Sequence, residues 1–201
     1  MSVDFSDSAT RLNLMRAFAG ESQARNRYAF AAGVAKKKGL QVIQGVFTFT
    51  AEQERAHAKV FYDQLAPVKG ETLMVDGGYP VDIYTEMTDY LRAAQHNEYE
   101  EHDDVYPHFA QVAEEEGFVE IAHIFRMVAA IEKAHGDRFG RFAELLEADK
   151  LFAADKPVRW MCLHCGEIIE TERAPALCPV CKHGQGYFVR LDMAPFVSLE
   201  N

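Results

Sequence analysis

Three pairs of ionisable residues, each spaced three apart and centred on a glutamate, interrupt the apolar helical patterns of this 201-residue chain. Residues three apart lie on the same face of an α-helix, so each pair directs two side chains toward one neighbour. Carboxylates and imidazoles are rarely buried without a partner, and several of them in one core require a cation. The pairs are Glu54/His57, Glu98/Glu101 and Glu132/His135, and Glu21 joins them from an earlier helix.

Four helical stretches are predicted from apolar side chains that recur in steps of three and four. We expect a proline kink at Pro107, inside the third stretch, because proline disrupts a helix interior. The ionisable residues lie near the middle of each apolar stripe, so they would meet at one depth of a bundle. The acidic run Glu114–Glu116 lies off the stripe and is expected to be solvated. The predicted helices cover residues 8–39, 40–65, 82–116 and 118–148.

A weak internal repeat divides these helices into two hairpins of matching layout. Matching residues of the two hairpins are 77 or 78 positions apart, as in Glu21/Glu98, Glu54/Glu132 and His57/His135. Residues 66–82, which join the hairpins, form a longer connection than a simple helical hairpin needs. This length fits the long crossover of a ferritin-like bundle. The sequence therefore predicts an all-α, antiparallel four-helix bundle with a long crossover over residues 1–148.

The ionisable residues of the bundle match a set that holds two metal ions in di-iron and di-manganese carboxylate proteins. That set has one glutamate from each of two helices and Glu-x-x-His from each of the other two. Mixed carboxylate and imidazole ligation suits iron or manganese, with zinc as a further candidate. A single Glu-x-x-His on a helix is usually an exposed pair that binds no metal, so the prediction depends on the complete set. The lone carboxylates are Glu21 and Glu98, and the paired arms are Glu54–His57 and Glu132–His135.

Glu101 is a carboxylate beyond this minimal set. It lies one turn after Glu98 on the same helical face, where it competes with a histidine for one ion. An oxidised ion favours the charged oxygen, whereas a reduced ion tolerates neutral nitrogen. We therefore expect a ligand that exchanges when the metal changes its oxidation state.

All four cysteines lie near the C-terminus, in two Cys-x-x-Cys pairs separated by 12 residues. Such pairs form a tetrahedral four-thiolate site, and their spacing does not choose between iron and zinc. In a reducing cytosol, clustered thiols hold metal more often than they form disulfides. We predict a linker over 149–158 and a small β-rich metal domain over 159–201, with Trp160, Tyr187 and Phe188 in its core. The predicted ligands are Cys162, Cys165, Cys178 and Cys181.

The composition excludes several classes of partner. A net charge of −10 without a basic run argues against nucleic acid. The N-terminus has no signal-peptide pattern, and the longest uncharged run, Gly39–Ala51, is 13 residues, too short to cross a bilayer. No glycine-rich phosphate loop is present in the sequence, so reducing power would come from a separate reductase. These features predict a cytoplasmic protein with neither a membrane nor a nucleic acid as partner.

The chain resembles rubrerythrins over nearly its whole length. Ala19–Tyr28 is similar to the first-helix signature of that family, Glu98–Gly117 to its third helix, and the cysteine pairs to its rubredoxin-type domain. The resemblance implies a non-haem di-iron peroxidase that reduces hydrogen peroxide to water and protects against oxidative stress. Electrons would pass through a C-terminal Fe(Cys)4 centre, in which zinc can replace iron in recombinant protein.

The resemblance also implies roles for single residues. His57 would exchange with Glu101 as the iron changes oxidation state, and Tyr28 and Tyr106 would lie next to the ligands. From its place in the stripe alone, Tyr28 is equally a core aromatic. One departure is Lys182, because free-standing rubredoxins usually have glycine after the last cysteine. The implied di-iron ligands are Glu21, Glu54, Glu98, Glu101, Glu132 and His135.

The implied partners are hydrogen peroxide, an electron-donating reductase or rubredoxin, and a second copy of the chain. The family arrangement is a head-to-tail homodimer or higher homo-oligomer, with electrons passing between subunits. Two alternatives remain open from the sequence. One is a ferroxidase or iron-handling protein, since ferritins share the bundle, although iron storage needs no one-electron relay. The other is a structural zinc ribbon carried on a helical scaffold.

Overall fold

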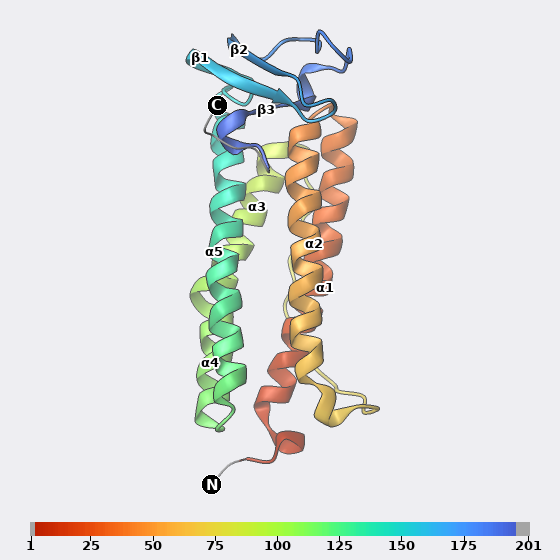
Figure 1. Ribbon diagram of the computed structural model, residues 1–201. Helices are drawn as coiled ribbons and strands as arrows, with labels where there is room; N and C mark the ends of the chain where they lie inside the picture. Colours follow the sequence, from red (N-terminus) through yellow and green to blue (C-terminus); the bar gives the residue numbers. More distant parts are fainter. Residues whose placement is uncertain (1–2, 196–201) are drawn as a thin grey trace.

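The computed structural model describes residues 3–195, which form a long helical bundle with a small sheet at one end (Figure 1). Two helical hairpins lie side by side: α1 packs along α2, and α5 packs along both α3 and α4. This architecture confirms the predicted ferritin-like bundle. The helices are α1 (Ala9–Lys37), α2 (Gln41–Gln64), α3 (Met87–Glu100), α4 (Tyr106–Glu115) and α5 (Val119–Glu147).

The third rod of the bundle consists of two helices joined by a π-helical turn, η3 (Glu101–Val105). Pro107 lies in the first turn of α4, which continues the rod directly from η3. The irregular turn directly precedes Pro107 and includes Asp103, whose carbonyl oxygen would accept the N–H that the proline lacks, so the helix is disrupted in the turn where a proline acts. Single π-turns inside helices frequently occur at functional sites, and this one carries Glu101.

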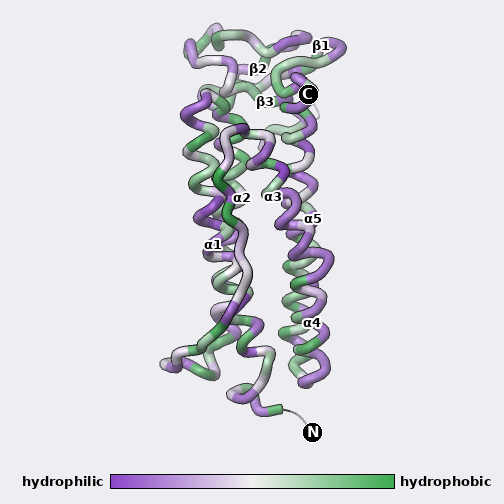
Figure 2. The backbone as a smooth tube through the Cα atoms, turned by 180° about the vertical axis from the view of Figure 1, so that it is seen from behind, coloured by the Kyte–Doolittle hydropathy of each residue, from purple (hydrophilic) through white to green (hydrophobic). Residues whose placement is uncertain are grey.

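After the short turn η2 (Ala66–Val68), the crossover runs in extended form along the bundle to the start of α3 (Figure 2). Polar contacts attach it to the helices at two places. Arg16 of α1 lies 2.9 Å from Asp76, and Asp82 pairs with Arg27 of α1 and accepts a hydrogen bond from Asn97 of α3. The predicted long crossover is thus confirmed.

The bundle has two apolar clusters on either side of a polar layer. Phe47 and Phe139 belong to the cluster nearer the sheet, and Phe61 and Phe125 belong to the other. These aromatic residues flank the Glu-x-x-His arms of α2 and α5 along the sequence. The apolar clusters therefore hold the polar layer at a fixed depth. Within residues 3–195, no helix combines the length and apolarity that a membrane span requires.

The C-terminal domain is an antiparallel sheet in the order β2-β1-β3. Trp160 and Phe188 are fully buried in its core with Cys162 and Cys178, and Tyr187 packs against them. This confirms the aromatic core expected from the sequence. The strands are β1 (Ala153–Cys162), β2 (Ile168–Arg173) and β3 (Phe188–Arg190), followed by the turn η5 (Leu191–Met193).

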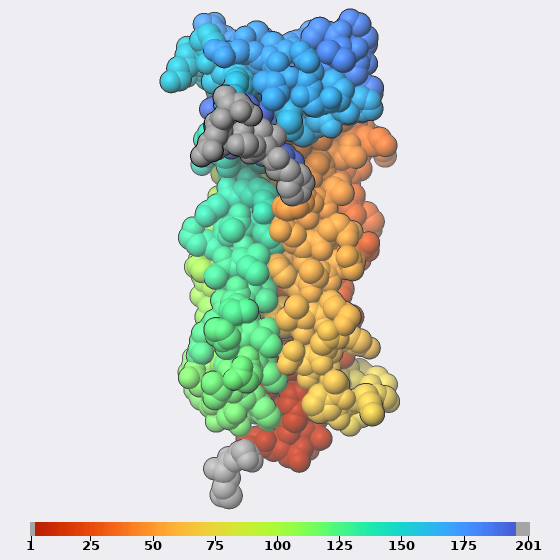
Figure 3. Space-filling view, in the orientation of Figure 1, coloured from red at the N-terminus to blue at the C-terminus, as the bar shows by residue number. Residues whose placement is uncertain are grey.

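The strand β1 begins at Ala153, inside the segment 149–158 that the sequence predicted as a linker. Leu151 and Val189 are buried in the same apolar cluster as Phe142 of α5. A Cβ atom added to Gly186, in the short turn before β3, would lie 1.8 Å from the carbonyl oxygen of Gly39, so this turn and the α1–α2 turn are in close contact. The space-filling view shows the C-terminal domain covering this end of the bundle (Figure 3).

Candidate metal centres

The structure brings all seven predicted bundle residues into the polar layer between the apolar clusters. Six of them are at most 7% exposed, and Glu101 is half-buried on η3. Their periodicity explains this convergence, since each occupies a position of the stripe that faces the neighbouring helices. They come from α1 (Glu21), α2 (Glu54, His57), α3 (Glu98), η3 (Glu101) and α5 (Glu132, His135).

Glu54 and Glu132 each extend across both halves of this layer. The Nδ1 atom of His57 lies 3.2 Å from Glu54 Oε2 and 2.9 Å from Glu132 Oε1. The Nδ1 atom of His135 lies 2.9 Å from Glu54 Oε1 and 2.8 Å from Glu132 Oε2. Each histidine therefore faces one oxygen of each of the two carboxylates, which is the arrangement that two bridging carboxylates provide.

The lone glutamates complete the two halves. Glu21 Oε2 lies 3.9 Å from Nδ1 of His57, and Glu98 Oε2 lies 3.7 Å from Nδ1 of His135. The two imidazole rings are nearly parallel, with centroids 5.5 Å apart. The layer consequently contains two half-sites, each with one histidine, one lone glutamate and a share of two common glutamates.

Several polar atoms of this cluster are buried and have no hydrogen-bond partner among residues 3–195. They include one oxygen each of Glu21, Glu54 and Glu98, both oxygens of Glu132 and both ring nitrogens of His135. The short contacts between them lack hydrogen-bond geometry, so the lone pairs are available to common centres. Buried atoms of this kind are costly without a counter-charge, and carboxylate and imidazole donors suit iron or manganese. The residues present therefore fit a pair of such ions.

When no cation is bound, protonation reduces the negative charge of this buried cluster. Burial, then repulsion from Glu132, raises the pKa of Glu21 well above its usual value, and burial with repulsion from Glu54 raises the pKa of Glu98 to about 8. Burial alone would lower the pKa of His57, but its contacts with Glu132 and Glu54 raise it to about 9. Metal binding must therefore displace protons from these groups.

Two buried tyrosines hold the lone glutamates from the opposite hairpin. The Tyr106 hydroxyl donates a hydrogen bond to Glu21 Oε1, and the Tyr28 hydroxyl donates one to Glu98 Oε1. The tyrosines are 78 positions apart and thus follow the internal repeat. In each lone glutamate one oxygen is fixed by a tyrosine, which leaves the other directed at its half-site.

Glu101 makes the two half-sites unequal. Its carboxylate groups with those of Glu21 and Glu132, with ligand oxygens of all three within 4.8 Å of one another. It therefore belongs to the half-site of Glu21 and His57. The equivalent position of the first hairpin, 77 residues earlier, is Ala24, so the sequence supplies this additional carboxylate only once.

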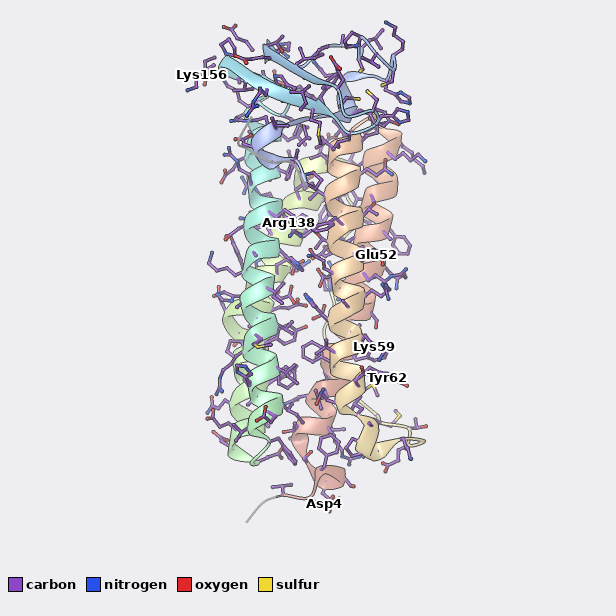
Figure 4. All side chains as sticks on the ribbon, in the orientation of Figure 1. Asp4, Glu52, Lys59, Tyr62, Arg138 and Lys156 are labelled. Atoms are coloured by element: carbon purple, nitrogen blue, oxygen red, sulfur yellow. The ribbon has the colours of Figure 1, made fainter. Side chains whose placement is uncertain are left out.

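Arg138 is a second asymmetric feature, and it was not among the residues predicted from the sequence. It extends from α5 toward α2, where it donates 2.9 Å hydrogen bonds to Thr50 Oγ1 and Gln53 Oε1 (Figure 4). Burial lowers its pKa, although the neighbouring carboxylates of the layer act in the opposite direction. Its position one turn after His135 on the same helix is the signal that could have revealed it.

The four cysteines form the second centre. The Sγ atoms of Cys162 and Cys181 are 3.7 Å apart, and those of Cys165 and Cys178 are 3.6 Å apart. A tetrahedral site with metal–sulfur bonds of about 2.3 Å requires sulfur separations of about 3.8 Å. All four thiols are free of disulfides and lie within 4.8 Å of one another, so the set fits one metal ion.

Backbone amides support these sulfurs. The N–H groups of His164 and Cys165 hydrogen-bond to Cys162, and those of Val180 and Cys181 hydrogen-bond to Cys178. Hydrogen bonds of this kind stabilise thiolates and tune the potential of a bound metal.

The two cysteine loops differ at the residue after the second cysteine. Gly166 has a φ of 80° and Lys182 has a φ of 62°, so both lie in the left-handed region. Lysine is disfavoured there, because its Cβ atom crowds the backbone. The Lys182 side chain donates a hydrogen bond to the carbonyl oxygen of Pro179 at 2.7 Å. The departure from glycine noted in the sequence thus places a strained lysine beside the metal loop.

A ferritin-like bundle with two Glu-x-x-His arms, joined to a four-cysteine domain, defines a carboxylate di-iron protein with a rubredoxin-like module. The rubrerythrin family model matches residues 13–143, and the model of the rubrerythrin rubredoxin-like domain matches residues 160–189. The chain belongs to the rubrerythrin family. Its cofactors are accordingly a di-iron site with glutamate and histidine ligands and a four-cysteine site of rubredoxin type.

Relatives and solved structures agree with this assignment. The rubrerythrin of Porphyromonas gingivalis is 45% identical over 188 residues, covering 94% of this chain and 92% of that protein. The rubrerythrin of Clostridium perfringens is 44% identical, with 89% and 92% covered. A structure of partially reduced nigerythrin superposes with a TM-score of 0.62 at 27% identity, covering 94% and 91% of the two chains. A Mycobacterium tuberculosis bacterioferritin, with a TM-score of 0.62 at 17% identity, shares the fold.

Proposed function

We propose that this protein is a peroxidase that reduces hydrogen peroxide to water with electrons relayed through its Fe(Cys)4 centre. One peroxide molecule takes up two electrons and two protons and yields two water molecules. The observation that supports the proposal is the presence, in one chain, of two adjoining metal half-sites and a separate four-thiolate site suited to one-electron transfer. A family in which both domains occur together adds to this support.

The residues have distinct parts in this proposal. Glu54 and Glu132 would be shared by the two ions, Glu21 with His57 would complete one half-site, and Glu98 with His135 would complete the other. When bound, the iron pair supplies both electrons and Lewis acidity toward the peroxide oxygens. Glu101 gives one half-site a ligand in excess, on the same side as His57, and this is the geometry that an exchange between the two requires.

Protons have a separate source within the chain. Tyr106 is buried with its hydroxyl on Glu21, and Glu101 is the half-buried member of the carboxylate layer. Burial and the nearby charges of Glu101 and Glu21 raise the pKa of Tyr106 well above its usual value, so the phenol keeps its proton. Burial and repulsion from Glu98 raise the pKa of Glu101 well above its usual value. Glu101 is therefore the group that we assign to holding and delivering protons for the product waters, while the Tyr106 phenol keeps Glu21 in place.

Electron delivery involves a second copy of the chain. The four-cysteine domain covers the end of the bundle at the α1–α2 turn, whereas His57 lies 16 residues along α2 from Gln41, about 24 Å at 1.5 Å per residue. This separation is too great for efficient transfer within one subunit. A head-to-tail homodimer, or a higher homo-oligomer, would place the Fe(Cys)4 centre of one copy near the di-iron site of the other. A cytoplasmic reductase or rubredoxin then re-reduces the cysteine-bound iron.

Stopped-flow mixing of the anaerobically reduced, iron-loaded protein tests the proposal. We expect hydrogen peroxide to re-oxidise both centres faster than dioxygen does, with no burst of mineralised iron. Glu132→Ala is the matched control, because it removes a shared carboxylate while leaving the four-cysteine site intact, and its cysteine-bound iron should stay reduced. Faster oxidation by dioxygen with iron deposition would support the ferroxidase alternative, and zinc in the four-cysteine site of protein from its native source would oppose the relay.

A further inference from the structure

A cavity of about 240 Å³ lies between α1, the crossover and the third rod of the bundle. Its wall on the bundle side includes Glu101 and Tyr106, the two residues that face the half-site of Glu21. Its wall on the outer side is the crossover segment that runs from Gly77 to Pro80. One water molecule occupies about 30 Å³ of liquid, so the cavity has room for several small molecules.

The outer wall is a short strap with fixed ends. At one end Asp76 accepts from Arg16 of α1, which donates to both its side chain and its carbonyl oxygen. At the other end Asp82 pairs with Arg27 of α1 and accepts from Asn97 of α3. Only residues 77–81 lie between these anchors, so the strap is held in place over the cavity.

Tyr79 is the side chain that the strap directs at the cavity, and two glycines accommodate its ring. A Cβ atom added to Gly77 would lie 2.8 Å from the Tyr79 hydroxyl oxygen and 2.9 Å from Cζ, so the ring lies directly over this residue. A Cβ atom on Gly20 of α1 would meet Tyr79 Cε1 at 3.9 Å. Tyr79 as a whole is 42% exposed and Tyr106 is 1% exposed, and both line the cavity, so the cavity leads from the surface to the buried layer.

We propose that this cavity is the passage by which peroxide reaches the Glu101 side of the metal layer, and that Tyr79 sets the size limit for what enters. The inference rests on the proposed peroxidase function. Hydrogen peroxide passes beside the ring, whereas the ring excludes bulky alkyl hydroperoxides. Tyr79 touches neither metal nor reacting atoms in this scheme, so it acts as a specificity-determining residue at the entrance.

Two variants open the passage in different ways. Tyr79→Ala removes the ring, and we expect kcat/KM for tert-butyl hydroperoxide to rise about tenfold relative to that for hydrogen peroxide, a typical effect of relieving one steric exclusion. Gly77→Ala keeps the ring but displaces it, and should shift the same ratio in the same direction by less. Gly20→Leu projects a side chain into the cavity and should slow both peroxides.

Azide association with the oxidised, iron-loaded protein provides a readout that is independent of turnover. We expect its rate, followed by visible absorption, to rise in Tyr79→Ala and to fall in Gly20→Leu. Met74→Ala is the control. Met74 belongs to the same crossover and is 84% exposed, but it lies outside the strap and does not line the cavity. Thermal unfolding of each variant shows whether the bundle is intact.

The outcomes separate the two proposals. If wild-type protein reduces hydrogen peroxide while Tyr79→Ala leaves both the substrate ratio and the azide rate at the Met74→Ala values, the passage is elsewhere and the inference fails. If wild-type protein reduces no peroxide, the proposed function fails, and the azide rates of the variants still decide whether Tyr79 controls entry. A loss of folding in Gly20→Leu leaves the decision to Tyr79→Ala and Gly77→Ala.

Discussion

Tyr106 of α4 donates a hydrogen bond to Glu21 of α1, so the second hairpin fixes a carboxylate that belongs to the first. Tyr28 of α1 does the same for Glu98 of α3 in the opposite direction. The lone glutamates are therefore positioned across the contact between the hairpins, and the metal layer depends on the correct docking of both.

Tyr106→Phe should weaken metal binding without changing the shape of the core. The variant leaves a buried Glu21 oxygen without its donor, and loss of a hydrogen bond to a ligand typically costs about 10–100-fold in metal affinity. Competition with a chelator during Co²⁺ loading measures this change. Tyr28→Phe should have a similar effect through Glu98. Tyr90→Phe is the control, because Tyr90 is 9% exposed in the apolar cluster nearer the sheet, where its ring packs against Tyr84. Equal affinities in all three variants would contradict a positioning role.

Glu101→Gln should affect one half-site more than the other. Glu101 groups with Glu21 and Glu132 and has no equivalent in the first hairpin, so its charge acts on the half-site of His57. In metal titrations of the apoprotein we expect one ion to bind at least about tenfold more weakly and the other to be little changed. Asp103→Asn, an exposed change on the same π-turn, should leave both unaffected. A uniform loss at both ions would show that Glu101 does not discriminate between them.

The sequence was sufficient to predict the bundle and the members of its metal layer, because helical periodicity converts spacing directly into direction. Glu54 and His57, or Glu132 and His135, must share a face if they are helical, whatever the details of packing. The cysteine pairs were equally informative, since their short loops restrict where the four sulfurs can lie. The length of the crossover likewise followed from residue counts alone.

Other features depend on tertiary contacts that leave no local pattern. The π-turn at Glu101–Val105 results from a shift of backbone hydrogen bonds in the turn before Pro107, and the proline alone does not predict that this turn is π-helical. The strand that begins at Ala153 is fixed by the docking of Leu151 and Val189 on the bundle, which no periodicity in 149–158 announces. Arg138 interacts with Thr50, 88 positions away, and was recognised only in the folded chain.

Glu116 makes another tertiary contact that its local sequence does not predict. It was expected to be solvated, and instead it caps the start of α1. Its carboxylate accepts hydrogen bonds from the backbone N–H groups of Ala9 and Thr10 at 2.8 Å each and from the Thr10 hydroxyl at 2.6 Å. These are two of the N–H groups that a helix leaves unpaired at its N-terminus. The positive end of the helix dipole adds to the attraction for a charged carboxylate.

Glu116→Gln should therefore destabilise the protein by about 1 kcal/mol at neutral pH, a usual value for loss of a helix cap. Burial raises the pKa of Glu116, but its hydrogen bonds with Thr10 and Ala9 outweigh this and hold it below the ordinary value of 4.5. A lowered folded-state pKa gives stability that is complete above 4.5 and is lost as the pH falls through the folded pKa. Urea unfolding at several pH values measures this contribution. The difference in unfolding free energy between the wild-type protein and Glu116→Gln should be constant at pH 5–7 and shrink at lower pH. Glu115→Gln, at the exposed neighbouring position, should show no such dependence.

Lys182 allows backbone strain to be separated from charge at the four-cysteine centre. With a φ of 62°, its side chain costs about 1–2 kcal/mol that glycine would not. Lys182→Gly should therefore stabilise the C-terminal domain by about 1 kcal/mol, after allowing for the greater chain entropy of glycine when unfolded. Lys182→Ala keeps the strain and removes the same charge, so it should not stabilise. Unfolding followed by fluorescence of Trp160, the single tryptophan of the chain and fully buried in this domain, measures both effects.

Because a nearby cation favours the reduced, more negative iron–thiolate centre, both variants should lower the reduction potential by a similar amount. A gain in stability shared by Lys182→Ala would refute the assignment to strain, and a potential lowered only in Lys182→Gly would refute the assignment to charge.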